Sequence, residues 1–117
     1  MSGLREMPIF TKTYDFLAWL VPVTNNFPRI HRRTITQRLL DAALDFQEAL
    51  LEANEARGRV RSDWLVRADA SLNKIRLYLR LAHRLRWLND SQYRHVARMV
   101  AELGRLLGAW QKATVST

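Results

Sequence analysis

The sequence predicts an all-α fold, an antiparallel up-down-up-down four-helix bundle. Apolar side chains recur every three or four residues over long stretches, which is the spacing of one helix face. Only four glycines and three prolines interrupt the chain, and strand-like alternation is weak. The connections are short, so sequential helices should be antiparallel neighbours. At 117 residues we expect a single domain, with flexible ends at residues 1–10 and 113–117.

The first helix is expected over residues 13–26, with Thr11 or Thr13 as its N-cap. Pro22 should kink it, because a proline in a helix interior removes a backbone donor. The sequence Asn-Asn-Phe-Pro at residues 25–28 should end it. Its expected apolar face consists of Tyr14, Leu17, Leu20 or Val21, and Thr24.

The second helix is expected to open with a capping box, in which Thr34 and Gln37 satisfy each other's free backbone amides. It should stop near Gly58, because glycine is the commonest residue just beyond a helix end. Its apolar face consists of Ile35, Leu39, Ala42, Phe46, Leu50 and Ala53.

Ser62 is the expected N-cap of the third helix, and Asn-Asp-Ser-Gln at residues 89–92 should end that helix and begin the fourth. Both helices alternate three- and four-residue steps strictly, a repeat of about 3.5 residues that is typical of a bundle seam. The seam of the third helix consists of Leu65, Ala68, Leu72, Ile75, Leu79 and Ala82. The seam of the fourth consists of Tyr93, Val96, Val100, Leu103, Leu107 and Trp110.

The second and third helices each carry another apolar stripe away from the seam. Such a stripe fits either a wide core face with scattered exposed leucines or a subunit interface. Because one small bundle cannot easily bury both faces of a helix, we favour a homo-oligomer. The predicted oligomer interface consists of Leu40, Leu44, Leu51, Leu77, Leu81 and Leu88.

The charge is distributed unevenly between the two halves of the chain. Residues 57–112 contain 11 Arg, 2 Lys and 4 acidic residues, a net charge of +9, whereas residues 1–56 have a net charge of −1. This balance favours a polyanionic partner, whether nucleic acid, an anionic membrane surface or an acidic protein. Arginine suits bidentate phosphate contacts and stacking on bases, although GC-rich coding also enriches arginine.

The arginines are predicted to form two outward rows and one cluster. The row on the fourth helix lies roughly 150° from the seam, at 100° per residue. The row on the third helix has four-residue steps, at which like charges repel, so stability alone does not explain it. Bundle topology also brings the first and third connections to one end. The predicted nucleic-acid-binding residues are Arg29, Arg32, Arg33, Arg76, Arg80, Arg84, Arg86, Arg94, Arg98 and Arg105.

Two alternatives stay open for this surface. The arginines fit either a polyanion-binding surface or a surface that is merely solvated. Trp87, which lies among the basic residues of the end cluster, fits either a staple of the connection or a platform on which bases stack.

The sequence contains no recognisable catalytic or metal-binding constellation. Cysteine is absent, which excludes disulfides and thiolate sites. The histidines His31, His83 and His95 have no ligand partner four residues away, and no glycine-rich phosphate loop is present. We therefore expect a protein that is not an enzyme and that needs no cofactor or metal.

The chain also lacks a membrane-spanning pattern. Its longest apolar run, from Phe16 to Val23, is interrupted by Pro22 and is far shorter than the roughly 20 residues that span a bilayer. No signal peptide is evident. We expect a cytoplasmic protein with no membrane partner. A helical protein lying on a membrane surface is the weakest alternative, because paired seams replace the single wide apolar face that such helices have.

Five short segments carry a family resemblance: Tyr14 to Pro22, Phe27 to Arg29, Gln37 to Leu40, Leu50 to Asn54 and Gly108 to Lys112. In their order and spacing, over residues 9–113, they resemble the accessory variability determinant (Avd) proteins of diversity-generating retroelements. Those proteins belong to a wider four-helix bundle family that includes the S23 (intervening-sequence) proteins. Two departures are Ile35-Thr36, where the family often has Leu-Gly, and Ala109, where it often has a second glycine before the tryptophan.

The resemblance implies a basic, non-enzymatic protein that assembles as a pentameric ring of bundles. Such a protein would bind the reverse transcriptase of the retroelement and its template RNA or cDNA, and would support mutagenic copying. The arginine rows would then contact RNA, cDNA or the polymerase. The alternative is an S23-type bundle that acts as an oligomeric protein-binding adaptor without a nucleic-acid role.

Overall fold

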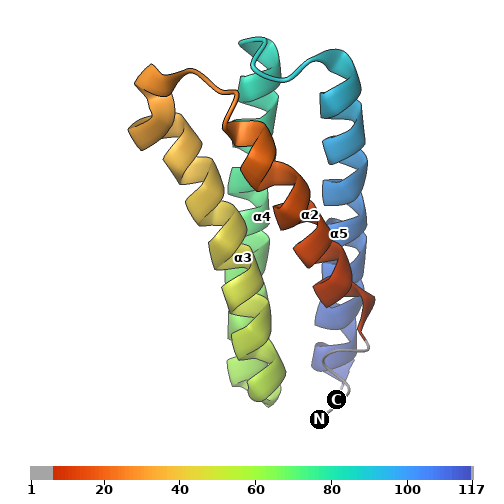
Figure 1. Cartoon of the computed structure of the whole chain (residues 1–117). Coiled ribbons are helices and arrows are strands. Elements are labelled where there is room, and N and C mark those ends of the chain that lie inside the picture. Colours follow the sequence, from red (N-terminus) through yellow and green to blue (C-terminus); the bar gives the residue numbers. More distant parts are fainter. Residues whose placement is uncertain (1–6, 117) are drawn as a thin grey trace.

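The structure, a computed structural model, describes residues 7–116 as helices joined by short turns (Figure 1). The elements are α2 (Pro8–Thr24), the 3-10 turn η1 (Arg29–His31), the π-helical turn η2 (Arg32–Thr36), α3 (Gln37–Glu55), α4 (Gly58–Arg84) and α5 (Asp90–Ser116). Consecutive helices are antiparallel, and α2 packs against both α3 and α5, which closes the bundle. The described residues form no strand. The predicted all-α four-helix bundle is therefore confirmed.

α2 differs most from the helix that the sequence predicted. It begins at Pro8, because a proline at the first helical position lacks only an amide that would have no partner there. The predicted cap Thr13 is buried inside the helix, where its hydroxyl donates to the carbonyl of Ile9 (2.6 Å). The apolar face is also rotated from the predicted one, since Tyr14 is 68% exposed. The core face consists of Ile9, Phe10, Thr13, Phe16, Leu20 and Thr24.

Both stretches that were predicted as flexible ends contain helical residues. Pro8–Phe10, predicted to belong to a flexible end, form the first turn of α2, and both Ile9 and Phe10 are buried. Residues 113–116 continue α5. The ring of Phe10 lies 5.9 Å from that of Trp110, so the start of α2 packs on the last part of α5. Residues 1–6 and 117, the rest of the predicted flexible ends, lie outside the described residues.

The predicted capping box at the start of the second helix is wrong. Thr34 lies in η2, where its hydroxyl donates to the carbonyl of His31 (3.3 Å), and no side chain caps α3. The physical reason is that η2 leads into α3 without a break, and the residue before α3, Thr36, already has helical dihedral angles. The free amides that a capping box satisfies are therefore not created at this point.

Gly58 begins a helix rather than ending one. α3 ends at Glu55, and α4 starts at Gly58 after a two-residue turn, so the predicted cap Ser62 lies inside α4. The φ angle of Gly58 is +55°, a left-handed conformation that costs glycine little. Gly58 therefore marks the turn between the two helices, but it lies at the start of α4 and not just after the end of α3.

The core follows the predicted seams closely in α3, α4 and α5. Every predicted seam residue of α4 is buried, and in α5 only Tyr93 remains half-buried. In α3 the predicted face is buried from Leu39 to Ala53, while Ile35 in η2 is half-buried. Phe16 and Phe46 are fully buried, and burial of such a side chain contributes about 1.5–3 kcal/mol.

None of the helices within residues 7–116 combines the length and the apolar character that crossing a bilayer requires.

Candidate nucleic-acid interface

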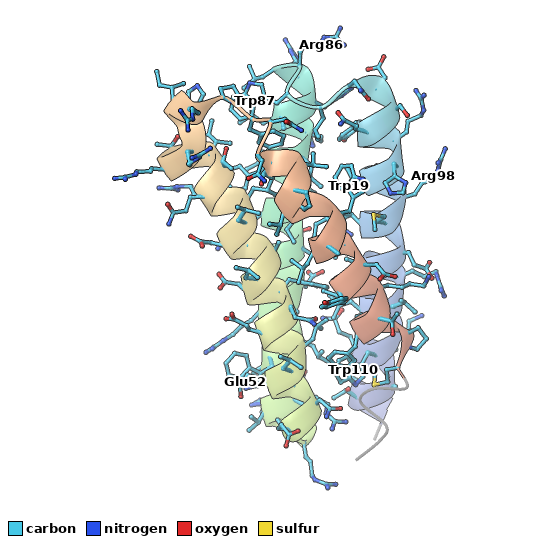
Figure 2. The ribbon with its side chains drawn as sticks, viewed as in Figure 1. Trp19, Glu52, Arg86, Trp87, Arg98 and Trp110 are labelled. Atoms are coloured by element: carbon cyan, nitrogen blue, oxygen red, sulfur yellow. The ribbon has the colours of Figure 1, made fainter. Side chains whose placement is uncertain are left out.

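One end of the bundle brings the α2–α3 and α4–α5 connections together. The ring of Trp87 lies 5.4 Å from that of Phe27 and 5.2 Å from that of His31, between ring centroids. Figure 2 shows Trp87 at this end, with Arg86 projecting beyond it. The predicted meeting of the two connections is confirmed. Because Trp87 is half-buried and engaged by two other rings, it staples the connections and is not an open platform for bases.

α4 ends in a Schellman motif. The amide of Trp87 donates to the carbonyl of Ala82 (2.8 Å), and the amide of Arg86 donates to the carbonyl of His83 (3.0 Å). This geometry requires a left-handed residue at position 86, and the φ angle of Arg86 is +67°. Glycine is the usual residue in such a position, so an arginine here is unexpected.

A reciprocal capping box opens α5. The side chain of Asn89 accepts from the amide of Gln92 (2.8 Å), and the side chain of Gln92 accepts from the amide of Asn89 (2.9 Å). The sequence reasoning placed a helix boundary here but did not assign these hydrogen bonds. The Asn-x-x-Gln spacing was the signal that reveals them. The box fixes where α5 starts and so positions Asp90, its first residue.

His83 and Asp90 form an interaction across this turn that the sequence reasoning missed. The Nε2 atom of His83 donates to Oδ1 of Asp90 at 2.8 Å, and Nη1 of Arg86 lies 3.6 Å from the same oxygen. The hydrogen bond from His83 holds the pKa of Asp90 below its ordinary value. The His83 ring also stacks on Tyr93, with centroids 4.3 Å apart and planes 4° apart. No local pattern signals this pairing, because it depends on the conformation of the turn.

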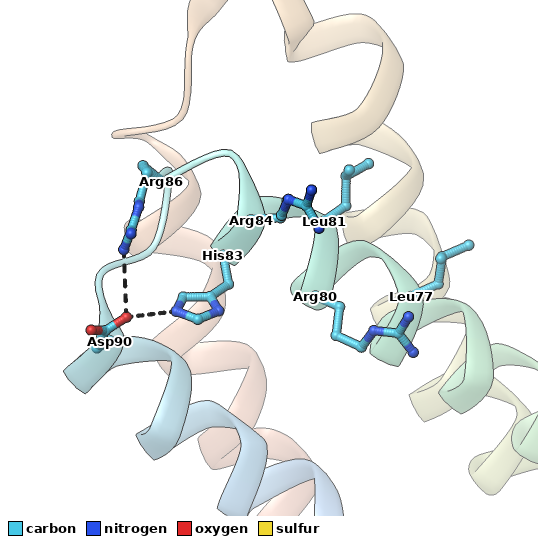
Figure 3. A pocket seen from close by; sticks show the side chains of 7 residues that line it. All are labelled: Leu77, Arg80, Leu81, His83, Arg84, Arg86 and Asp90. Carbon is cyan, nitrogen blue, oxygen red and sulfur yellow. Dashed lines mark hydrogen bonds and ion pairs between the residues drawn. The ribbon is translucent and has the colours of Figure 1, made fainter.

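An open pocket of about 600 Å³ lies beside the turn (Figure 3). Arginine side chains from the end of α4 and from the turn line it, together with two leucines and the His83–Asp90 pair. The lining residues are Leu77, Arg80, Leu81, His83, Arg84, Arg86 and Asp90. Three guanidinium groups and one carboxylate leave this pocket with an excess of positive charge.

All ten arginines of the predicted interface are exposed. Within residues 7–116 only two of them form ion pairs, Arg86 with Asp90 and Arg105 with Glu102 (2.7 Å). The hydrogen bonds from Arg105 lower the pKa of Glu102 and the pairing raises the pKa of Arg105. Exposed pairs of this kind contribute little to stability. The remaining guanidinium groups of the predicted interface have no carboxylate partner among the described residues.

The ten arginines do not form one cluster. Arg80, Arg84 and Arg86 meet at the pocket beside the turn, whereas Arg98 lines a separate cavity of about 320 Å³ between α2 and α5. Arg29, Arg32 and Arg33 lie in η1 and η2, at the same end as the turn. Arg105 lies further along α5. The structure thus resolves the predicted surface into a basic end and two rows that lead away from it.

The acidic residues of α3 lie away from this surface. Asp45, Glu48 and Glu52 line the groove between α3 and α4, opposite Arg67 and Lys74. Figure 2 shows Glu52 on the α3 side of the bundle and Arg98 projecting on the α5 side. No carboxylate of α3 forms an ion pair within the described residues. Among the described residues, no arginine of the predicted interface is therefore paired directly with a carboxylate of α3.

The predicted leucine interface is only partly an exposed surface. Leu88 is 0% exposed and belongs to the core, so its assignment to an interface is wrong. It is buried because the turn that Trp87 staples folds the next residue inward. Leu40 and Leu81 are half-buried. The residues of the set that stay exposed are Leu44, Leu51 and Leu77.

Within the part of the chain that the structure describes, no three histidine or acidic side chains are grouped so that they could hold a metal ion.

Comparison with known proteins identifies a family and a solved structure of similar fold. The sequence model of the bAvd-like family matches residues 7–114. A crystal structure of a protein of unknown function from the S23 ribosomal protein family of Bacteroides thetaiotaomicron has a TM-score of 0.79 and 19% identity, over 89% of this chain and 95% of that chain. At that identity the likeness shows the fold alone. No curated protein matches the chain. Because the family model covers nearly all of the sequence, the chain belongs to the bAvd-like family.

Proposed function

We propose that this protein is a non-enzymatic accessory protein of a diversity-generating retroelement. In this role it binds the reverse transcriptase and the template RNA or cDNA, and it supports mutagenic reverse transcription. Membership of the bAvd-like family supports the role. The arginine surface supports the nucleic-acid part of it, and that surface is the single observation that carries the proposal.

The spacing of the arginines on α4 destabilises the helix, and a polyanionic partner would offset this destabilisation. Arg76, Arg80 and Arg84 follow one another at four-residue steps on α4, and all three are exposed. Like charges at this spacing each destabilise a helix by about 0.2–0.5 kcal/mol. Arg76 bonds only to the neutral Asn73 (2.8 Å), so the described residues do not relieve the repulsion with a carboxylate. Phosphates of a nucleic acid would relieve it and release counterions on binding.

The direct test reverses the charge of these three arginines. The triple variant Arg76→Glu, Arg80→Glu and Arg84→Glu should lose most RNA affinity while its circular dichroism remains helical. The salt dependence of binding should also change, because each lost phosphate contact removes about 0.7 from the slope of log K against log salt for a single strand.

The control reverses the charge of two exposed arginines at the opposite end of the bundle, Arg57→Glu and Arg59→Glu, and so changes the net charge by four units instead of six. This control should bind RNA much more tightly than the triple variant. Absence of RNA binding by the natural protein at low salt, or full binding by the triple variant, would refute the nucleic-acid role.

The polymerase part of the proposal is tested by co-purification. The reverse transcriptase encoded beside this gene should be retained by the tagged protein, and nuclease treatment should show whether RNA bridges the two. A reverse-transcriptase gene and a pair of near-identical repeats in the genomic neighbourhood should accompany the gene. A chain encoded without either one contradicts the retroelement role.

A pentameric ring is part of the proposed function. Light scattering should give about five times the mass of the chain, and a monomer would count against the ring. Exposed Leu44, Leu51 and Leu77 favour a second candidate, an oligomeric adaptor that binds only protein. The adaptor and the accessory protein differ in one measurement, because only the accessory protein should gain mass on addition of RNA.

A further inference from the structure

Arg86 stands in a backbone conformation that does not suit arginine. Its φ angle of +67° is left-handed, and it occupies the position of the Schellman motif where glycine is usual. The side chain does not compensate for this, because it is 78% exposed and its nearest carboxylate oxygen is 3.6 Å away. A residue held in such a conformation without a structural gain is a candidate for a functional role.

The pocket beside Arg86 combines charge with an apolar wall. Arg80, Arg84 and Arg86 each bring a guanidinium group to it, while Leu77 and Leu81 supply the apolar part. Leu77 is 53% exposed, although an exposed leucine gains nothing from water. Figure 3 shows the two leucines on the same stretch of α4 as Arg80 and Arg84, with Arg86 on the turn.

Among the described residues that line the pocket, Asp90 supplies the one carboxylate, and this carboxylate is already engaged. Asp90 accepts a hydrogen bond from His83 (2.8 Å), so its charge is directed at that ring. The longer contact from Arg86 to the same oxygen is exposed and is easily exchanged for a phosphate. The pocket thus offers strong donors for an anion beside an apolar surface that suits a base or a sugar.

We propose that this pocket holds a nucleotide of a single-stranded nucleic acid, with Arg80, Arg84 and Arg86 on its phosphates and Leu77 and Leu81 against its base or sugar. The inference rests on the proposed nucleic-acid role and specifies the strand and the site. The pocket, with a volume of about 600 Å³, accommodates a nucleotide. A paired base presents only its edge, whereas a base in a single strand exposes its face to apolar side chains.

The decisive variant is Arg86→Gly, because structural and functional roles predict opposite results. Glycine suits the left-handed position, so the melting temperature should stay unchanged or rise by about 2–5 °C. If Arg86 contacts phosphate, affinity for a labelled oligouridylate should fall about fivefold to tenfold, and the salt slope should become shallower by about 0.7. A variant that is more stable and yet binds less tightly cannot be explained by misfolding.

Arg57→Gly is the matched control, since it removes the same charge at the opposite turn, where the backbone is extended. It should lower affinity less than twofold. Leu77→Ala removes part of the apolar wall of the pocket without changing its charge. It should weaken oligouridylate binding about threefold and leave binding to a duplex of equal length unchanged. Val66→Ala, at a similarly exposed apolar residue of α4 that belongs to neither predicted interface, should change neither.

Three results would overturn the inference. The first is an equal loss of oligouridylate affinity in Arg86→Gly and Arg57→Gly. The second is unchanged oligouridylate affinity in Leu77→Ala. The third is equal affinity of the natural protein for the single strand and the duplex. If the natural protein binds neither probe at low salt, the proposed function itself fails. The two failures are therefore distinguishable.

Discussion

Each of the two turns that flank α4 contains a residue with a left-handed φ angle, and the two residues are of different types. The α3–α4 turn places Gly58 at a φ angle of +55°, and the α4–α5 turn places Arg86 at +67°. At the first turn the residue suits the conformation, whereas at the second it does not. The first turn therefore carries little backbone strain, whereas the second holds an arginine side chain in spite of the strain.

The arginines near the two turns differ in the same way. Arg61 closes the end of α3, because its Nε and Nη2 atoms donate to the carbonyls of Ala53 (2.9 Å) and Asn54 (3.4 Å). Arg84 and Arg86 make no comparable bonds to helix-end carbonyls among the described residues. An arginine count does not separate these two uses. Only the hydrogen bonds show which arginines hold the fold and which remain available to a partner.

The largest expected effect comes from removing the staple of the second turn. Trp87→Ala should lower the free energy of unfolding by about 2 kcal/mol, less than the loss for a fully buried tryptophan because Trp87 is half-buried. Urea denaturation measures the loss. Trp64→Ala is the control, since Trp64 is also half-buried but has its closest ring contact with Arg67 of its own helix (4.5 Å). A larger loss at Trp64 would contradict the stapling role.

A smaller loss in the free energy of unfolding is expected from a substitution at the first turn. Gly58→Ala should destabilise the protein by about 1 kcal/mol, because alanine resists the left-handed conformation. Nothing lies within 4 Å of the added Cβ atom, so the loss is conformational and not steric. Thermal melts of this variant and of Arg86→Gly should shift in opposite directions. Shifts of the same sign would break the comparison between the turns.

The capping box at the second turn should contribute about as much to the free energy of unfolding as Gly58 does, or slightly less. Asn89→Ala should cost about 0.5–1 kcal/mol, because the amide of Gln92 loses its acceptor. Hydrogen exchange should speed up in the first turn of α5 and not in its centre. Ser91→Ala, at an exposed position of the same turn, should leave exchange unchanged.

The smallest expected effect is the pH dependence at Asp90. Because its pKa is lowered in the folded protein, the stabilisation is fully present above the unfolded pKa and is lost as pH falls through the folded pKa. Asp90→Asn should therefore lower the melting temperature slightly at neutral pH, and the difference should vanish in strong acid. A difference that grows on acidification would contradict the His83–Asp90 hydrogen bond.

The long seams were predictable because their three- and four-residue steps are regular over many turns. From Leu65 to Ala82 these steps place six apolar residues on one face of α4, whereas the second apolar stripe of that helix is shorter. In α2 the stretch from Phe16 to Val23 is nearly all apolar, so the helices that pack on it determine which of its faces is buried. Leu88 was assigned wrongly for a related reason, since a periodic extension of α4 does not foresee the turn that ends the helix at Arg84.

The sequence by itself determined the helical class, the seams of α3, α4 and α5, and the presence of an exposed arginine surface. These follow from local spacing and charge, which act along one helix at a time. The tertiary structure decided the start of α2, the stapling by Trp87, the His83–Asp90 pair and the pocket beside Arg86. These features depend on φ angles and on contacts between connections far apart in the chain, and no local pattern of residue types fixes such contacts.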